Sequence, residues 1–313
     1  MTVSQNYLMK TSICIVVVFN HRYDRNIDKI RKIYNGRFSK VVFLVPFYDG
    51  DDSDVISVYE SSYQFHGYFI QAYEKLMATK CRYFLLVADD IIINPEYNEA
   101  NILSYLGMEN KKVGIDCISP LNQERGFEWI HARYSSRPFF HKATEWKESL
   151  PSYDEALSLF NGFWNHSYSE KYEDNFYAPM AGESEESFMK AKRDFWERNG
   201  GKEDIPYPMA IGYSDILFVR EDIMRILFHR MGVFSAMNLF VEIAIPTAIV
   251  LSALREEVSL FCELPDRSRM LMWDKETISE FSGKCDNNYK KLMDIWDSSW
   301  LYAHPVKLSS WEV

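Results

Sequence analysis

Hydrophobic and polar residues alternate along the first third of the chain in blocks that predict strands and helices in turn. Ile13–Phe19, Val41–Val45 and Tyr83–Ala88 are apolar runs of strand length, and such runs predict buried strands. Between them, Asn26–Tyr34 and Tyr63–Met77 place their apolar residues on one helical face. This order predicts an α/β fold, with a mixed, mostly parallel sheet flanked by helices.

The pattern is less regular further along the chain. Val113–Ile118 predicts another strand, but from about Leu121 to Pro208 the alternation fades and the segment becomes dense in Trp, Tyr, Phe and His. Regular blocks return with a predicted strand at Ile216–Val219, the start of a helix at Ile223–Phe228 and an apolar helix at Leu239–Leu254. Because no repeat or low-complexity linker divides residues 1–313, we interpret the chain as a single domain.

Composition narrows the classes of protein that remain. The formal net charge is −10 and no Lys/Arg-rich run is present, so we expect no nucleic-acid partner. The five cysteines are scattered without a CxxC pair, the N-terminus lacks a signal pattern, and the longest apolar stretch contains Glu242 and Pro246. We therefore expect a cytoplasmic protein with reduced thiols and no transmembrane segment. Composition predicts no oligomeric state.

Two adjacent aspartates, Asp89 and Asp90, follow the third predicted strand. The carboxyl ends of strands are where open α/β sheets bind ligands, and two unpaired carboxylates resist desolvation. A hard divalent cation that carries a phosphorylated ligand explains the pair. The alternative is that Asp89 caps a turn and Asp90 pairs with a Lys or Arg. The acidic loop Asp49–Asp54 lacks the ligand spacing of an EF-hand, which favours a solvated turn.

Several short motifs extend this picture over most of the chain. In chain order they are Asn20-His21-Arg22 after the first strand, Val45-Pro46 after the second, Val87-Ala-Asp89-Asp90 with Asn94-Pro95 shortly after, Gly212-Tyr-Ser-Asp-Ile-Leu-Phe-Val-Arg220, an acidic residue on an apolar helix, and His304-Pro305. Together they resemble the GT-A glycosyltransferases, whose fold is a Rossmann-like α/β sheet and whose DxD-like motif binds a divalent metal. Here the motif reads Ala-Asp-Asp instead of Asp-x-Asp.

The resemblance implies a role for each motif. Residues 1–120 would form the half that binds the nucleotide sugar, and residues 121–313 would form the acceptor-binding half with the C-terminal tail. A UDP- or GDP-sugar would contact residues after the first strand, Mn²⁺ or Mg²⁺ would bind the aspartates, and a late histidine would complete the metal or phosphate site. The implied nucleotide-sugar contacts are Phe19, Asn20, His21, Arg22, Asp89 and Lys307, and the implied metal ligands are Asp90, Asp89 and His304.

Transfer of a sugar needs a base for the acceptor hydroxyl. In inverting enzymes of the resembled family a carboxylate at the start of a helix takes this proton, and Glu242 occupies that place in chain order. An isolated carboxylate on an apolar helix must be paired, protonated or facing a cavity, so a buried partner for a backbone or Arg group is the alternative role. Asp215, just before the strand Ile216–Val219, is the rival base or a ligand of the acceptor hydroxyl.

The aromatic middle segment suits a glycan acceptor, since aromatic rings pack against the C–H faces of sugars. The expected acceptor-binding residues are Trp129, His131, Trp146 and Trp164, with core packing as the alternative for each. Two other functions remain open: a non-catalytic carbohydrate-binding protein on the same frame, and a sugar nucleotidyltransferase. The second is disfavoured because no glycine-rich basic loop follows the first strand.

Overall fold

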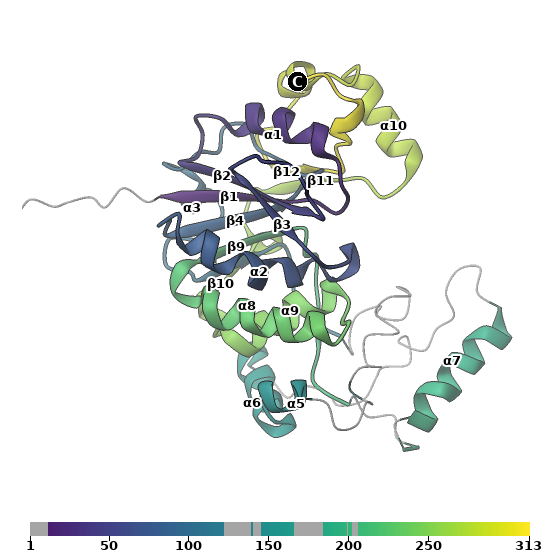
Figure 1. The fold of residues 1–313 in the computed structure, drawn as a ribbon. Coiled ribbons are helices and arrows are strands. Elements are labelled where there is room, and N and C mark those ends of the chain that lie inside the picture. Colours follow the sequence, from purple (N-terminus) through teal and green to yellow (C-terminus); the bar gives the residue numbers. More distant parts are fainter. Residues whose placement is uncertain (1–11, 122–138, 140–144, 166–183, 199, 202–205) are drawn as a thin grey trace, which may run out of the picture.

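A seven-stranded sheet forms the centre of the molecule (Figure 1). The computed structural model describes residues 12–121, 139, 145–165, 184–198, 200–201 and 206–313. The strand order is β10-β6-β9-β4-β1-β2-β3, and the strands are β1 (Ile13–Val18), β2 (Lys40–Pro46), β3 (Val55–Val58), β4 (Tyr83–Ala88), β6 (Val113–Ile115), β9 (Ile216–Arg220) and β10 (Val258–Leu260). Only β9 runs antiparallel to its neighbours in this sheet. The expected α/β fold with a mixed, mostly parallel sheet is confirmed.

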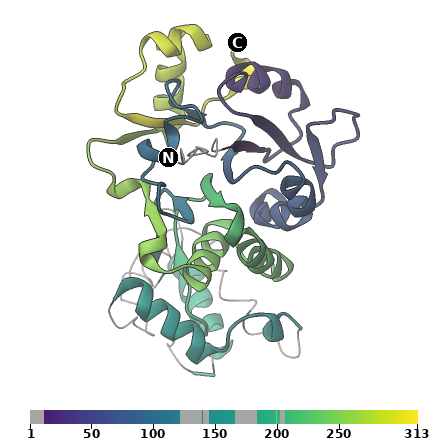
Figure 2. The ribbon, with the colours of Figure 1, turned by 90° about the vertical axis from the view of Figure 1, so that its left-hand side faces the viewer.

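Both faces of the sheet are covered, which explains why its central strands are apolar at every position. Along β1, Cys14, Val16 and Val18 join one buried cluster, whereas Ile13 and the alternate residues join the other. Helices α2 (His66–Met77), α8 (Glu221–Ala236) and α9 (Val241–Ser252) cover the first face. Helix α1 (Ile27–Tyr34) and the C-terminal elements cover the second, as Figures 1 and 2 show from two directions.

The C-terminal elements form a small second sheet. Strands β11 (Ser268–Leu271), β12 (Trp300–His304) and β5 (Ile92–Ile93) pair in the order β11-β12-β5. Helices α10 (Lys275–Lys284) and α11 (Tyr289–Asp294) lie between β11 and β12 in the chain. Since β5 follows the two aspartates after β4, its pairing with β12 brings the end of the chain back to them.

The middle of the chain is more helical than its pattern predicts. It contains α5 (Trp146–Ser149), α6 (Tyr153–Trp164) and α7 (Glu185–Arg198). Helix α6 begins with a capping box, in which Ser152 and Glu155 satisfy each other's backbone N–H groups. The strand predicted at Val113–Ile118 is shorter, ending at Ile115, and Ser119–Pro120 instead forms β7 against β8 (Ala210–Ile211). The short helix α3 (Ile102–Tyr105) precedes β6.

Five single-turn 3₁₀ helices complete the described part of the chain, at Asp24–Asn26, Ser62–Gln64, Arg255–Glu257, Phe261–Glu263 and Leu308–Ser310. Helix α9 is buried nearly all round and carries Pro246 in its interior, as its apolar sequence predicts. Among the residues described, no helix has the length and apolar character needed to cross a membrane.

Candidate functional site

The order of the strands creates a topological switch point between β1 and β4. From β1 the chain continues to β2 and β3 on one side, and it then returns to β4 on the other side of β1. The segments that leave the carboxyl ends of these two parallel strands therefore diverge, and crevices of this kind are where open α/β sheets bind ligands. Residues Phe19–Arg22 follow β1, and Asp89 and Asp90 follow β4. The Asp89 N–H donates to the Val18 carbonyl at 3.0 Å, which fixes the two ends side by side.

Two more aspartates reach the same edge of the sheet. Because β9 is antiparallel to β4, the residue before β9 lies at the carboxyl end of β4, and the Ala88 N–H donates to the Asp215 carbonyl at 2.8 Å. Asp116 follows β6, whose direction matches that of β4. The sequence interpretation named Asp215 but not Asp116, and it did not predict that both share one edge with Asp89 and Asp90.

The C-terminal segment supplies a lysine and a histidine to the site. The Val306 N–H donates to the Asp90 carbonyl at 2.7 Å, and the Lys307 ammonium forms an ion pair with Asp90 Oδ2. His304 Nε2 lies 3.4 Å from Asp90 Oδ1 and 3.6 Å from Asp215 Oδ2. His304 therefore stands between two carboxylates, and Lys307 makes the ion pair that the alternative interpretation of Asp90 expects.

A cavity of about 420 Å³ opens beside Asp89 and Asp90. It is lined by Asn20, His21, Tyr23 and Asn26 from the segment after β1, and by Val306, Lys307, Leu308 and Ser309 from the C-terminal segment. Three buried oxygens in its wall, Asn20 Oδ1, Asn26 Oδ1 and Asp90 Oδ1, have no hydrogen-bond donor among the described residues. Buried acceptors without donors are costly, so the wall suits a ligand that carries N–H groups or a cation.

The two adjacent aspartates differ in protonation. Burial, together with the charge of Asp90, raises the pKa of Asp89 to about 7. Burial also acts to raise the pKa of Asp90, but His304 and Lys307 outweigh it and lower this pKa to about 2. Asp90 is therefore ionised at neutral pH, and Asp89 is close to half-protonated. Both residues are buried: Asp89 is 7% exposed to solvent and Asp90 is 9% exposed.

A second pair of carboxyl groups lies on the other side of His304. Burial raises the pKa of Asp215 to about 6, with His304 opposing this shift and Asp90 adding to it. Burial and the charge of Asp215 raise the pKa of Glu242 to about 8. Glu242 sits in the first turn of α9, and its carbonyl accepts a hydrogen bond from the Gly212 N–H at 3.0 Å. A Cβ at Gly212 would lie 2.1 Å from the Cys117 carbonyl oxygen, so glycine is required for this close approach.

Asp90 and His304 would suit a hard divalent cation if a phosphorylated ligand supplied further oxygens. Within the described residues, no group of three or more His, Cys, Asp or Glu side chains is arranged to hold a metal ion. Asp90 Oδ1 is nevertheless buried without a hydrogen-bond donor in that part of the chain, and His304 Nε2 is close to it. Mg²⁺ is often held by only one or two carboxylates, with phosphate oxygens of the substrate and water completing its shell.

The side chains of two other residues named from the sequence are engaged elsewhere. The Phe19 side chain is fully buried and packs edge-on against Phe43, so only its backbone is left for a ligand. Arg22 forms ion pairs with Asp24 and Asp49 at the surface. These contacts neither support nor contradict a role for Phe19 or Arg22 in binding a nucleotide sugar.

The expected acceptor residues fall into two groups. Trp146 and Trp164 are partly buried and pack against the cluster under α8 and α9, on α5 and α6, which lie beyond those two helices from the sheet (Figure 1). Both tryptophans make the core contacts that the packing alternative expects. Trp129 and His131 lie outside the described residues.

The sequence did not predict a cluster of aromatic rings and an ion pair that lie next to His304. The Tyr213 ring lies 5.7 Å from the ring of His304 and stacks on Tyr302 at 6.2 Å. The Tyr302 hydroxyl donates to Asp116 Oδ1 at 2.8 Å, and Arg269 pairs with Asp116 Oδ2 at 2.8 Å. The alternating pattern Trp300-Leu-Tyr-Ala-His304 is a strand signal that could have indicated β12. Nothing local indicates its partners.

No protein-family model matches this chain, and no curated protein sequence matches it.

Proposed function

We propose that this protein is a metal-dependent GT-A glycosyltransferase that moves a sugar from a UDP- or GDP-sugar to a hydroxyl of a glycan acceptor, with inversion. The observation that carries the proposal is the convergence, at the switch point of the sheet, of Asp90, His304 and Lys307 beside a cavity. A strand order with β9 as the one antiparallel member of the sheet, and an acidic turn at the end of β4, are consistent with it.

The cavity beside Asp90 has the groups needed for a nucleotide diphosphate. Lys307 is half-exposed in the wall, where its charge would offset the charge of a diphosphate. The unpaired Asn20 and Asn26 oxygens would accept N–H groups of a nucleobase. Asp90 and His304 would hold a divalent cation, which when bound would stabilise negative charge on the leaving diphosphate.

The carboxyl groups beyond His304 would act on the acceptor. With a pKa of about 6, Asp215 is ionised at neutral pH, while Glu242, with a pKa of about 8, holds its proton. A general base must be ionised when it accepts the hydroxyl proton. Asp215 is therefore the better base below pH 8, and Glu242 becomes competent above it.

One observation favours a rival function. The ion pair between Lys307 and Asp90 gives the carboxylate a cation from within the chain, as expected for a carbohydrate-binding protein without catalysis. Such a protein would bind a saccharide without binding a nucleotide, and it would show no turnover.

Nucleotide binding and slow donor hydrolysis separate these functions. We expect UDP or GDP with Mn²⁺ to raise the melting temperature of the full chain, because a ligand that binds only the native state stabilises it. A panel of UDP- and GDP-sugars with Mn²⁺ should then reveal which donor is hydrolysed without acceptor. The matched control is Asp52→Ala, which removes an exposed carboxylate from the loop Asp49–Asp54. Absence of any thermal shift with millimolar nucleotide and Mn²⁺ would remove the basis for the transferase.

A further inference from the structure

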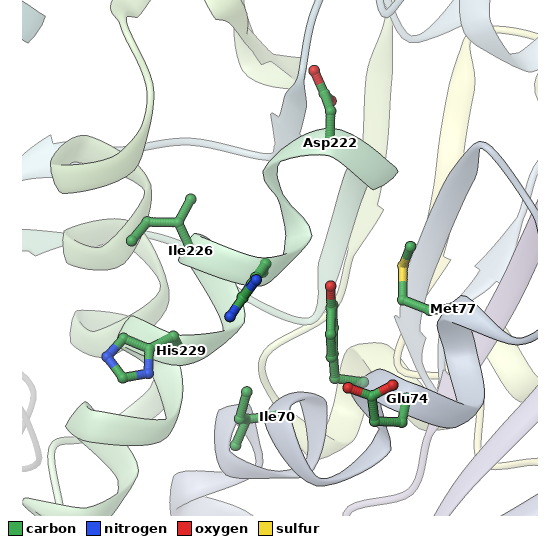
Figure 3. A pocket seen from close by; sticks show the side chains of 8 residues that line it. Ile70, Glu74, Met77, Asp222, Ile226 and His229 are labelled. Carbon is green, nitrogen blue, oxygen red and sulfur yellow. The ribbon is translucent and has the colours of Figure 1, made fainter.

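A surface groove lies between α2 and α8, and two residues of its lining, Tyr73 and Met77, also pack against the buried cluster. Its volume is about 810 Å³. Figure 3 shows Ile70, Glu74 and Met77 on one helix facing Asp222, Ile226 and His229 on the other. None of the residues that line it belongs to the cavity beside Asp90, so the proposed transferase leaves this surface without a role.

The packing of the two helices explains why a groove forms at this end. They run antiparallel, and a Cβ at Gly232 of α8 would lie 2.7 Å from Ile70 Cγ2 of α2, so the helices touch closely there. Towards Met77 and Asp222 the facing residues are larger, and a groove remains between them. Ile70 and Ile226 are 37% and 42% exposed on its walls, so each wall of the groove offers one branched apolar side chain.

The groove also carries charges without partners. Within the described part of the chain, neither Glu74 nor Arg225 forms an ion pair or a side-chain hydrogen bond. Asp222, by contrast, is paired with Arg220 at 2.7 Å. A carboxylate and a guanidinium that have no partner in the described structure, on the same groove as exposed isoleucines, are typical of a surface that recognises a partner by charge as well as by apolar contact.

Helix α7 presents a face that matches the groove. Met189 and Trp196 are 49% and 50% exposed, and Arg193 lies between them, exposed and without an ion pair among the described residues. Figure 1 shows α7 apart from the helices that cover the sheet. Within α7, Phe188 is buried on another side of the helix, so the stripe of Met189, Arg193 and Trp196 is the outward face.

The two surfaces share one spacing. On α7 the order is apolar, cation, apolar at positions 189, 193 and 196, and on α2 it is apolar, anion, apolar at positions 70, 74 and 77. Both sets follow i, i+4, i+7, which places them on one helical face over about 10 Å. If Met189 and Trp196 are placed against Ile70 and Met77, Arg193 lies opposite Glu74 or about one residue's rise away from it. This holds whether α7 runs parallel or antiparallel to α2.

We infer that α7 of one chain docks in the groove between α2 and α8 of a second copy, with Arg193 of each chain against Glu74 of the other. Met189 and Trp196 contact Ile70 and Met77 of α2 and the facing Ile226 of α8. Because each chain offers one helix and one groove, a two-fold dimer exchanges both contacts and leaves neither surface open.

Charge reversal tests this dimer in the full chain. We expect sedimentation velocity, from about 1 to 100 μM protein, to show a monomer–dimer equilibrium. Glu74→Arg alone and Arg193→Glu alone should each raise the dimer dissociation constant by about tenfold or more. The matched controls, Glu280→Arg and Lys284→Glu, reverse exposed charges on α10 and should leave the constant unchanged.

Mixing the two single variants gives the sharpest result. In the mixed dimer the groove of the Glu74→Arg chain meets α7 of the Arg193→Glu chain, and the second contact is native, so both contacts are complementary. The mixture should recover dimerisation to within about threefold of the unaltered chain. Docking of α7 on the groove of its own chain predicts no recovery on mixing. That outcome, a monomer at all concentrations, or a dimer that neither reversal weakens would each overturn the inference.

Discussion

Two groups of neighbouring aspartates differ in how deeply they are buried. In the loop Asp49–Asp54, the carboxylates are exposed to different degrees, and three of them form ion pairs with arginines. Arg22 pairs with Asp49, and Arg31 pairs with Asp54 at 2.8 Å and with Asp52 at 3.6 Å. Asp89 and Asp90 are buried, and Asp90 pairs with Lys307 and lies beside His304. Exposed pairs of the first kind contribute little to stability.

The difference shows that burial, more than the number of acidic residues, distinguishes a candidate site from a solvated turn. The loop is the more acidic segment of the two, yet its charges are hydrated and compensated. The pair after β4 is held in a desolvated position by the sheet, with one oxygen of Asp90 left without a donor among the described residues. Burial of charge without full compensation is expensive, and such positions are often functional.

The largest expected contrast between the two groups is in nucleotide binding with metal. Asp90→Ala should abolish the thermal shift given by Mn²⁺ with UDP or GDP, and it should lower donor hydrolysis by about 100-fold or more, because it removes the carboxylate that would hold the cation. Asp52→Ala should change neither quantity. Both variants are measured by thermal denaturation with and without ligand. An Asp90→Ala protein that keeps the full shift would place the ligand elsewhere.

The second prediction concerns the pH dependence of stability. Glu242 has a pKa of about 8 in the folded chain, against an ordinary value of 4.5. The folded state therefore binds the extra proton, so this group's contribution is complete below pH 4.5 and is lost as the pH rises through 8. We expect Glu242→Gln to be more stable than the unaltered chain at pH 9 by about 2–4 kcal/mol, and to lose that advantage at pH 5.

Urea denaturation at the two pH values measures this difference, and Asp215→Asn sharpens it. Because the charge of Asp215 contributes to the raised pKa of Glu242, its removal should move the transition to lower pH. The carboxylates of the loop Asp49–Asp54 provide the contrast, since Asp49 has a lowered pKa and Asp49→Asn should not gain stability at high pH. Parallel pH profiles for Glu242→Gln and the unaltered chain would contradict the assignment.

The strands that the sequence predicts best are those that can be recognised without knowing which remote strand they pair with. The apolar runs that form β1 and β4 are covered on both faces, so their composition alone marks them as interior strands. By contrast, β12 pairs with a two-residue strand, β5, that is remote in the chain. Nothing in the residues around Trp300–His304 encodes that partner, and the small sheet was not predicted.

The same limit applies to the candidate site. Asp89, Asp90, His304 and Lys307 could be named from the sequence, with a resemblance to guide the choice. The ion pair that joins Asp90 to Lys307 spans 217 residues of chain, and it depends on β12 lying beside β5. Asn26 was named only as the start of a helix, where a polar residue is usually a cap. In the structure its side chain makes no capping hydrogen bond, and its Oδ1 is buried without a donor among the described residues.

A third prediction compares two arginine–aspartate pairs. Asp116 is 2% exposed and pairs with Arg269, while Arg31 pairs with the exposed loop. We expect Arg269→Met to lower the free energy of unfolding by about 1–3 kcal/mol, because it leaves a buried carboxylate with Tyr302 as its remaining partner in the described structure. Arg31→Met should cost less than about 1 kcal/mol. Equal losses in urea denaturation would mean that burial does not distinguish these pairs.

The smallest expected effect separates two lysine–aspartate pairs. Lys307 pairs with Asp90 in the cavity wall, and Lys291 pairs with Asp286 at the surface. Lys307→Met should weaken binding of UDP or GDP by about tenfold without metal, since it removes a charge that would face the diphosphate. Lys291→Met should leave the affinity unchanged. Isothermal titration calorimetry with and without Mn²⁺ measures both. A gain in affinity of Lys307→Met when Mn²⁺ is present would show that Lys307 competes with the cation for Asp90 instead of assisting the nucleotide.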